Sequence, residues 1–503
     1  SRRAERRRLT MVRRRRSATH GIPVEDMAVV AQSVGAVLAA AWAHDYAPRI
    51  RALVLASPAF QVKLYVPFAR PGLALLRRLR GDFAVNSYVK ARFLTRDPER
   101  RASYAADPLV TRPISVDMLL GLHAAAKRVV ADARAITIPT QVLISGTDVV
   151  VRQAPQHRFY ENLGSAEKER HVLKGFRHDT LGERGRGEAL ARVRAFLEAR
   201  FAAPPHRPAL LEADRAGFTR DEADRLATPL PLLSGQGLAW AVVRLGLRLG
   251  SLLSEGLRVG RRTGFDSGST LDYVYRDEAR GLGPVGRAID RLYLDSIGWR
   301  GIRRRKAHVE ELLREGMARL QAAGKPIHVL DIAAGHGRYV LDALAGATVR
   351  PASVTLRDYS DLNVEAGTTL VAERGLAGTA RFVKGDAFDE RSLAASDPRP
   401  TLAVVSGLYE LFPDNALVAR SLAGLAAAVP PGGYLVYTGQ PWHPQLAFIA
   451  RALTSHRGGA WIMRRRSQAE MDALVEAAGF SKVGQRIDPW GIFTVSLARR
   501  TAP

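Results

Sequence analysis

Short apolar runs that alternate with helical patterns dominate the second half of the chain. One run ends at Asp331, and a turn of small residues with Gly335 and Gly337 leads into a helical pattern that begins at Arg338. A strand, a glycine turn and a helix N-terminus in this order are typical of a βαβ unit. Glycine has no Cβ, so the backbone of such a turn can approach a ligand closely. The pattern therefore predicts a ligand site at this turn.

Further predicted strands follow, and most of them have polar or glycine-containing ends. The next apolar run closes on Asp358, about 20 residues past the last glycine, where a nucleotide-binding fold places an acid on a ribose diol. The later strands are expected at residues 380–384, 402–406, 434–438, 482–487 and 492–497. Asp386 and Ala387 follow the first of these, and a Pro-Pro-Gly-Gly turn precedes the third. We expect the last two strands to form an antiparallel end of the sheet.

The first half of the chain shows a similar alternation. An apolar strand at residues 27–31 leads through Ser33 into an alanine-rich helix, and Asp148 and His178 each follow a later predicted strand. Ser33 lies in Ala-Gln-Ser-Val-Gly, a variant of the Gly-x-Ser-x-Gly turn that exposes a serine Oγ between a strand and a helix. The order Ser, Asp, His at strand ends therefore predicts a catalytic triad.

These three positions resemble the triad of α/β-hydrolases of the monoacylglycerol-lipase and serine-aminopeptidase type. By that resemblance Ser33 is the nucleophile, His178 the base and Asp148 its orienter, and residues 60–135 form a lid over an acyl pocket. Few residues precede the elbow strand, and no His-Gly loop supplies a second oxyanion donor. Loss of one such donor costs on the order of 10²–10³ in rate. We therefore expect a truncated domain with impaired hydrolase activity.

The strand ends of the second half resemble those of a Rossmann-type (class I) methyltransferase that uses S-adenosylmethionine (SAM). The resemblance covers the chain from about residue 300 to its end. It implies SAM as the cofactor, with its methionine part at the glycine turn, its ribose at the second strand end and its adenine at the third. The cofactor-binding residues so implied are Asp331, Ala334, Gly335, Gly337, Asp358, Asp386 and Ala387. An enzyme that binds NAD is the main alternative, but the hairpin finish fits it poorly.

The methyl acceptor should bind near the ends of the fourth and fifth strands, where ligands bind in such sheets. Glu410 and His443 follow these strands, and either could accept a proton from a hydroxyl or amine acceptor. The chemistry requires no metal. Residues 264–306, rich in tyrosine and arginine, are expected to form a helical cap over the SAM site. The whole arrangement resembles a bacterial family that fuses an α/β-hydrolase to a methyltransferase.

Composition changes divide the chain into four parts. Residues 1–17 are arginine-rich without apolar periodicity, which is typical of a disordered basic arm. Residues 18–200 are predicted as the partial α/β-hydrolase domain, 201–263 as a linker with an amphipathic helix, and 264–503 as the methyltransferase domain with its cap. The amphipathic helix could pack against its own domain or lie on an anionic membrane surface.

The net charge of +26 suits an anionic partner, but arginine is spread along the chain and no RNA-binding motif accompanies it. We expect a small-molecule or lipid acceptor and transient contact with an anionic membrane, and no nucleic-acid partner. The chain has no cysteine, which excludes disulfides and thiolate metal sites, and no apolar run approaches a bilayer's width. A cytoplasmic protein, peripheral at the inner membrane, is the expectation. A membrane- or nucleic-acid-binding protein that uses its basic surface without catalysis is the alternative.

Overall fold

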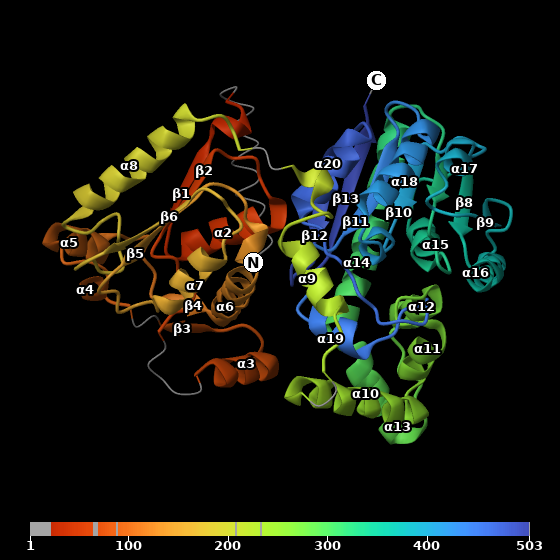
Figure 1. Cartoon of the computed structure of the whole chain (residues 1–503), viewed down its shortest axis with the longest axis horizontal. Helices are drawn as coiled ribbons and strands as arrows, with labels where there is room; N and C mark the ends of the chain where they lie inside the picture. Colours follow the sequence, from red (N-terminus) through yellow and green to blue (C-terminus); the bar gives the residue numbers. More distant parts are fainter. Residues whose placement is uncertain (1–21, 64–68, 87–88, 207–208, 232–233, 502–503) are drawn as a thin grey trace. The chain divides into compact units, whose positions relative to one another are not determined.

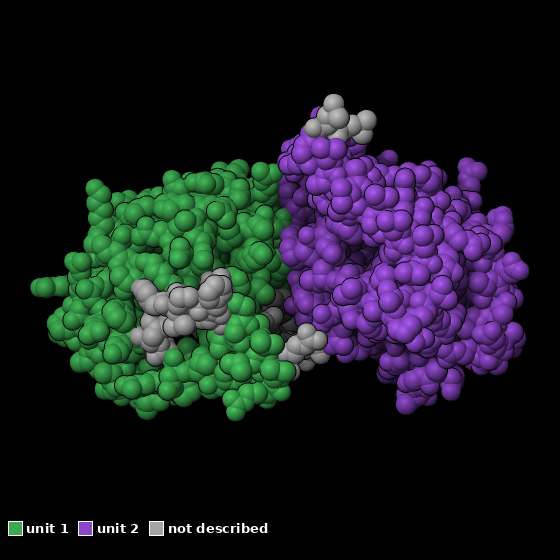
Figure 2. Space-filling view, turned by 90° about the horizontal axis from the view of Figure 1, so that it is seen from below, with its two compact units in different colours: residues 1–208 green, residues 209–503 purple. Residues whose placement is uncertain are grey.

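The structure is a computed structural model that describes residues 22–63, 69–86, 89–206, 209–231 and 234–501. The chain divides into two compact units, residues 1–208 and 209–503, which are coloured separately in Figure 2. The predicted basic arm, residues 1–17, lies outside the described residues. Each unit is built around its own parallel or mainly parallel sheet.

The first unit contains a four-stranded parallel sheet in the order β1-β2-β5-β6. The strands are β1 (Ala28–Gln32), β2 (Ala52–Ala56), β5 (Thr140–Ser145) and β6 (Lys168–Leu173). Alternate residues of the fully buried β2 belong to two cores, because helices cover both faces of the sheet. One core includes α2 (Val34–Tyr46), α6 (Val116–Ala131) and α7 (Ala154–Asn162), and the other includes α8 (Arg186–Ala202).

The segment between β2 and β5, predicted as a lid, contains short elements. Those before α6, which packs in the core, are α3 (Ala69–Arg80), β3 (Ala84–Asn86), α4 (Ala91–Leu94), α5 (Pro98–Ala106) and β4 (Pro113–Ser115). The strands β3 and β4 pair with each other as a separate antiparallel ribbon. The segment thus forms an insertion in the α/β framework, which confirms an α/β-hydrolase-like first unit.

The second unit contains a seven-stranded sheet in the order β12-β13-β11-β10-β7-β8-β9. Its strands are β7 (His328–Asp331), β8 (Ser353–Asp358), β9 (Ala380–Lys384), β10 (Leu402–Val405), β11 (Tyr434–Gly439), β12 (Phe480–Ile487) and β13 (Thr494–Arg500). The strands β7 to β11 are parallel, and β13 runs antiparallel between β11 and β12. The predicted antiparallel finish is therefore present, and the fold is that of a Rossmann-like methyltransferase.

Helices cover both faces of this sheet (Figure 1). One face carries α14 (Ile297–Ala322), α15 (Arg338–Ala345) and α16 (Asp361–Glu373), and the other carries α17 (Glu390–Ala394), α18 (Asn415–Ala428) and α20 (Gln468–Ala477). A separate group of helices packs around a third, aromatic core. It comprises α9 (Phe218–Ala227), α10 (Gly235–Leu253), α11 (Glu255–Thr263), α12 (Gly268–Arg276), α13 (Gly283–Leu294) and α19 (Leu446–Ala452).

The segment that the sequence suggests as a linker with an amphipathic helix is largely helical. Its residues from 209 onward belong to the second unit. Within the described ranges no individual helix has both the length and the apolarity to cross a membrane, and α10 and α11 meet those criteria only together, with a bend of 114° between them.

Candidate functional sites

Three side chains of the first unit form a continuous chain of hydrogen bonds. Ser33 Oγ lies 2.6 Å from His178 Nε2, and His178 Nδ1 lies 2.7 Å from Asp148 Oδ2. The other carboxylate oxygen of Asp148 accepts the amides of Val150 (2.7 Å) and Val151 (2.9 Å). A carboxylate only accepts, so we assign the Nδ1 proton to the bond with Asp148, which leaves Nε2 to accept from the serine hydroxyl. The arrangement is that of an activated nucleophile.

Ser33 occupies a strained backbone conformation between β1 and α2, with φ 54° and ψ −120°. Strain of this kind persists only where neighbouring groups hold it. Ser33 N donates to Ala56 O (2.9 Å), and Ser33 O accepts from Ala59 N (3.1 Å) and Val37 N (3.3 Å). Three bonds to the surrounding backbone thus fix the turn that presents the hydroxyl to His178.

Gln32 is a residue of this site that sequence reasoning missed. Its side-chain amide donates to Asp179 Oδ1 (2.7 Å), and its carbonyl oxygen accepts Leu181 N (2.9 Å). The loop after β6, which carries His178, is therefore bonded to the residue that precedes the nucleophile. Its place inside the Ala-Gln-Ser-Val-Gly turn was the only signal in the sequence.

In the second unit a cavity of about 570 Å³ lies at the carboxyl ends of β7, β8, β9 and β10. Of the seven predicted cofactor-binding residues, those that line it are Ala334, Gly335, Gly337, Asp358, Asp386 and Ala387. Asp331 does not line it; this residue is completely buried at the end of β7. The glycine turn and three successive strand ends thus surround one space, as the βαβ pattern predicted.

The glycine turn has a conformation that few other residues could adopt. Gly335 and Gly337 have φ values of 55° and 72°, in the left-handed region that favours glycine. A Cβ on Gly337 would lie 2.9 Å from Leu356 Cδ1. Gly335 N donates to Asp358 Oδ2 (2.9 Å), so a residue at the end of β8 holds the glycine turn that follows β7. The turn is therefore a rigid wall of the cavity.

Asp358 is already engaged by the protein. Its Oδ1 accepts Ser360 N and Asn363 Nδ2, both at 3.0 Å, and its Oδ2 accepts Gly335 N. A carboxylate has about four acceptor sites, so one site remains for a ligand hydroxyl. The resemblance implies that this acid binds both ribose hydroxyls, whereas the geometry leaves room for one direct bond.

Asp331 has an incompletely satisfied carboxylate beneath the turn. Its Oδ1 accepts Ala333 N (3.2 Å), and its Oδ2 has no hydrogen-bond partner among the described residues. Burial raises the pKa of this carboxyl to about 7. A buried anion that is only partly hydrogen-bonded is costly, so the site favours either protonation or a nearby cation.

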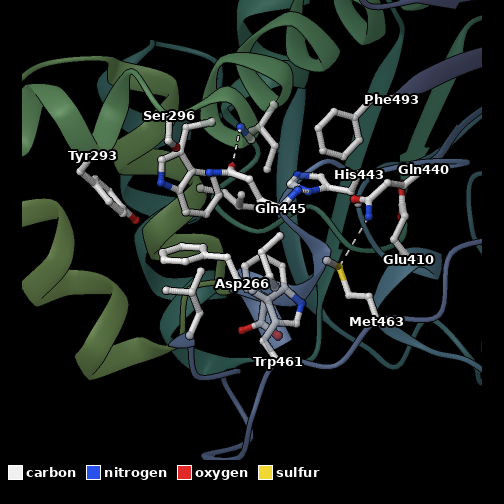
Figure 3. Close-up of a pocket in the computed structure, with 18 of the residues that line it drawn as sticks. Asp266, Tyr293, Ser296, Glu410, Gln440, His443, Gln445, Trp461, Met463 and Phe493 are labelled. Atoms are coloured by element: carbon white, nitrogen blue, oxygen red, sulfur yellow. Dashed lines mark hydrogen bonds between the residues drawn. The ribbon is translucent and has the colours of Figure 1, made fainter. Parts of the chain in front are cut away.

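A second cavity, of about 290 Å³, adjoins the first and shares with it Asp266, Leu271, Gly407 and Leu411. Most of its lining is aliphatic or aromatic. Figure 3 shows Tyr293 and Ser296 on one side and Phe493, His443, Gln440 and Glu410 on the other. The structure therefore brings both predicted acceptor-side residues, Glu410 and His443, into one apolar pocket.

The two acceptor-side residues differ in what they can do. Burial lowers the pKa of His443 to about 4, and its Nδ1 accepts Gln445 N (3.0 Å), so we assign the proton of the neutral ring to Nε2. Glu410 Oε1 accepts the hydroxyl of Thr438 (2.8 Å), while its Oε2 is buried without a hydrogen-bond partner among the described residues. Glu410 is thus suited to accept a proton and His443 to donate a hydrogen bond.

Two arginines on helices also line these cavities, Arg305 the second and Arg338 the first. Arg305 of α14 is buried at the second cavity, 3.9 Å from Glu410 Oε1 and 5.1 Å from the Phe493 ring centroid. Arg338 of α15 donates to both carboxylate oxygens of Asp272 on α12, at 2.5 and 3.3 Å. This ion pair joins α12 to the helix that follows the glycine turn. Sequence reasoning missed both arginines, since one Arg among many carries no signal.

Comparison with protein families gives two matches that divide the chain. The family described as "Putative methyltransferase" matches residues 193–500. The chain belongs to this methyltransferase family. The family described as "Serine aminopeptidase, S33" matches residues 10–185. The resemblances inferred for the two halves of the chain are therefore confirmed.

The chain is also similar to individual proteins. It is 55% identical over 481 residues to "Uncharacterized protein YnbC" of Escherichia coli (strain K12), which covers 95% of this chain and 82% of that protein. A monoacylglycerol lipase of Paleococcus ferrophilus is 21% identical, with a TM-score of 0.36, over 40% of this chain and 76% of its own. A SAM-dependent methyltransferase of Methanosarcina mazei is 20% identical, with a TM-score of 0.28, over 35% of this chain and 94% of its own.

Proposed function

We propose that the second unit transfers a methyl group from SAM to an apolar acceptor. The observation that carries this proposal is the pair of adjoining cavities, one walled by the glycine turn and three strand ends, the other apolar with Glu410 and His443 in its lining. The two cavities share four lining residues, so a ligand in each could place its reacting atoms next to those of the other, as an in-line displacement requires.

The residues of the larger cavity fit SAM in three respects. The backbone of Gly335 and Gly337 permits close approach of a ligand. Asp331 does not line this cavity, but its Oδ2 is buried beneath the turn without a hydrogen-bond partner among the described residues, and we assign it an indirect electrostatic effect on the positive charge of an amino-acid end. The remaining acceptor site of Asp358 suits a ribose hydroxyl. Asp386 and Ala387 line the same cavity and are the proposed contacts of the adenine.

When bound, SAM supplies an electrophilic methyl group on a positively charged sulfur. The chain's own contribution is to hold the acceptor and to manage its proton. Glu410 Oε2, buried and without a hydrogen-bond partner among the described residues, would accept the proton of a hydroxyl or amine. His443 Nε2–H would donate to an acceptor oxygen. The mostly apolar lining offers water few hydrogen-bond partners, which strengthens both interactions.

Calorimetric titration with SAM and with its demethylated product tests this proposal. We expect a dissociation constant near the micromolar range for the wild type and a loss of about 10-fold or more in Asp358→Ala, which removes a ligand contact and the acceptor of Gly335 N. Ser33→Ala is the matched control and should bind as the wild type does. A folded wild type that binds neither ligand would overturn the proposal, and binding of NAD instead would favour a dehydrogenase-type site.

A second activity is favoured by the triad of the first unit. We infer that Ser33 is the nucleophile of an esterase or lipase, because its Oγ, His178 and Asp148 form one hydrogen-bonded chain. Val34 N–H, which follows the nucleophile, is the proposed oxyanion donor. That the activity is impaired for lack of a second donor stays a prediction. Labelling with a fluorophosphonate tests the nucleophile, with Ser33→Ala as control; an unlabelled wild type would contradict it.

A further inference from the structure

The helix α10 exposes a stripe of large apolar side chains. They are Leu238, Val242, Leu245, Leu249 and Leu252, each between 54% and 69% exposed. Spacings of three and four residues place them on one side of the helix. The only residues of α10 that are buried are Gly237 and Ser251. The helix therefore exposes five large apolar side chains, while its two fully buried residues are small.

The neighbouring helix α13 continues this surface. It contacts α10 at the same end of the second unit (Figure 1). Leu282 caps its N-terminus, and Val285 and Leu292 lie within it; all three are between 63% and 76% exposed. We name the exposed apolar residues of the two helices the α10–α13 face. Large exposed apolar patches are rare on a protein without a partner.

The charge at the α10–α13 face is positive. The helix α10 contains two arginines and no acidic residue. Arg248 on α10 and Arg287 on α13 are exposed, and neither guanidinium forms an ion pair or a side-chain hydrogen bond within the described part of the chain. Apolar side chains with free arginines beside them are typical of helices that lie in the interface of an anionic bilayer.

The α10–α13 face is also continuous with the second cavity. Leu247 of α10 and Ile289 and Leu292 of α13 line that cavity. Leu292 is 76% exposed as well, so the cavity reaches the surface at this face. Glu410 and His443 line the same cavity. An apolar chain that entered between α10 and α13 would therefore pass from the exposed face into the pocket that holds these polar groups.

We propose that the α10–α13 face docks on an anionic lipid bilayer and that the methyl acceptor is an amphiphile whose apolar chain enters the second cavity from that surface. A second copy of the chain is a poorer occupant, because a two-fold contact would bring the arginines of α10 against themselves without an acid on that helix. The docking stands on its own, whereas the entry of the acceptor rests on the proposed methyl transfer.

Flotation of the full chain with lipid vesicles tests the docking. We expect binding to vesicles of phosphatidylcholine with phosphatidylglycerol, and binding at least about 10-fold weaker to phosphatidylcholine alone or at high salt. Leu249→Glu should weaken binding by about 10-fold, and addition of Val242→Glu should abolish it. Leu190→Glu changes a leucine of α8 that is 47% exposed and is the matched control, expected to bind as the wild type does.

The outcomes separate docking from methyl transfer. SAM titration of Leu249→Glu should match the wild type, since Leu249 lines neither cavity. Undiminished flotation of the double variant would overturn the docking. So would a wild-type dimer that Leu249→Glu converts to a monomer without any vesicle binding, because the face would then join two copies. Delivery of a lipid acceptor to the second cavity is tested by incubating the protein with SAM labelled in its methyl group and with vesicles, and measuring the label in the extracted lipid. A wild type that binds SAM and vesicles yet labels no lipid would overturn delivery alone.

Discussion

The sites of the two units show themselves in opposite ways. In the first unit the reactive side chains are bonded to one another, from Ser33 through His178 to Asp148. In the second unit the notable polar atoms lack hydrogen-bond partners among the described residues, as at Asp331 Oδ2 and Glu410 Oε2, and they lie beneath or beside a cavity. The site of the first unit is recognised by its hydrogen bonds, and that of the second unit by its cavities.

The difference follows from the chemistry each site would perform. A serine nucleophile must be activated by its neighbours before the substrate arrives, so its partners are visible without a ligand. Methyl transfer from a sulfonium needs little covalent help and depends on the positions of two ligands. Protein atoms that bind those ligands therefore lack a hydrogen-bond partner when the ligands are absent. A buried polar atom without a partner is therefore as informative in the second unit as a short hydrogen bond is in the first.

Removal of the nucleophile is expected to have the largest effect. Ser33→Ala deletes the atom that attacks the ester, so hydrolysis of a p-nitrophenyl ester should fall by about 10³-fold or more, to whatever basal rate the remaining groups support. The measurement is the rate of nitrophenolate release by wild type and variant, with SAM affinity as the control in both. Equal rates in the two proteins would mean that the bonded triad is not a catalytic one.

The buried acid of the second unit should make stability depend on pH. The pKa of Asp331 is raised by burial from 3.8 to about 7, so between these values the folded chain holds a proton that the unfolded chain has released. The free energy of unfolding should therefore fall as pH rises from about 4 to 7, by up to about 1.4 kcal/mol per pH unit. Asp331→Asn carries no charge and should abolish this dependence.

Urea unfolding at several pH values checks this. Tryptophan fluorescence is suitable, because every tryptophan except Trp42 lies in the second unit. Saturating SAM should reduce the difference between wild type and variant if its positive charge lies near Asp331. Parallel pH curves for the two proteins without ligand would show that the carboxyl is not the cause.

His443 should give a pH effect of opposite sign. Burial lowers its pKa from 6.5 to about 4, so the unfolded chain takes up a proton over a range where the folded chain does not. Stability should be fully present above about 6.5 and be lost as pH falls toward 4. His443→Gln should flatten this acid limb, and nitrogen-15 histidine spectra should show the ring neutral at pH 6. A ring already protonated at that pH would contradict the lowered pKa and make His443 a cation in the second cavity.

The sequence predicted the parts of both sites that depend on local pattern. Strand ends, the glycine turn and the serine elbow are encoded in a few consecutive residues, so Ser33, Gly335 and Asp358 could be found from spacing alone. The insertion of β13 between β11 and β12 could not, because pairing of distant strands leaves no local mark.

The depth of a residue and its partners were also beyond the sequence. Asp331 ends a strand like other site acids, yet it lies buried beneath the turn and not in the cavity wall. Arg305 reaches the second cavity from a helix that begins at Ile297, far from the strand ends in the sequence. The position of Leu292 could not be predicted either, because only the packing of α13 shows that this leucine both faces solvent and lines a cavity.

Substitution of Gln32 is expected to have the smallest effect, because this residue positions the histidine loop and does not react itself. Its amide bonds the loop of His178 through Asp179 and Leu181 but touches no triad atom in any bond described above. Gln32→Ala should therefore lower the turnover of a p-nitrophenyl ester by about 10-fold, since a hydrogen bond to a charged group such as the Asp179 carboxylate contributes roughly 1.5–3 kcal/mol, and fluorophosphonate should still label Ser33. Gln32→Glu keeps the acceptor for Leu181 N but sets a carboxylate against that of Asp179, so it should be worse than alanine above about pH 5 and recover as the pH is lowered. A variant that is equally impaired at every pH would assign Gln32 a general structural role, whereas recovery on acidification would show that the bond to Asp179 positions the histidine.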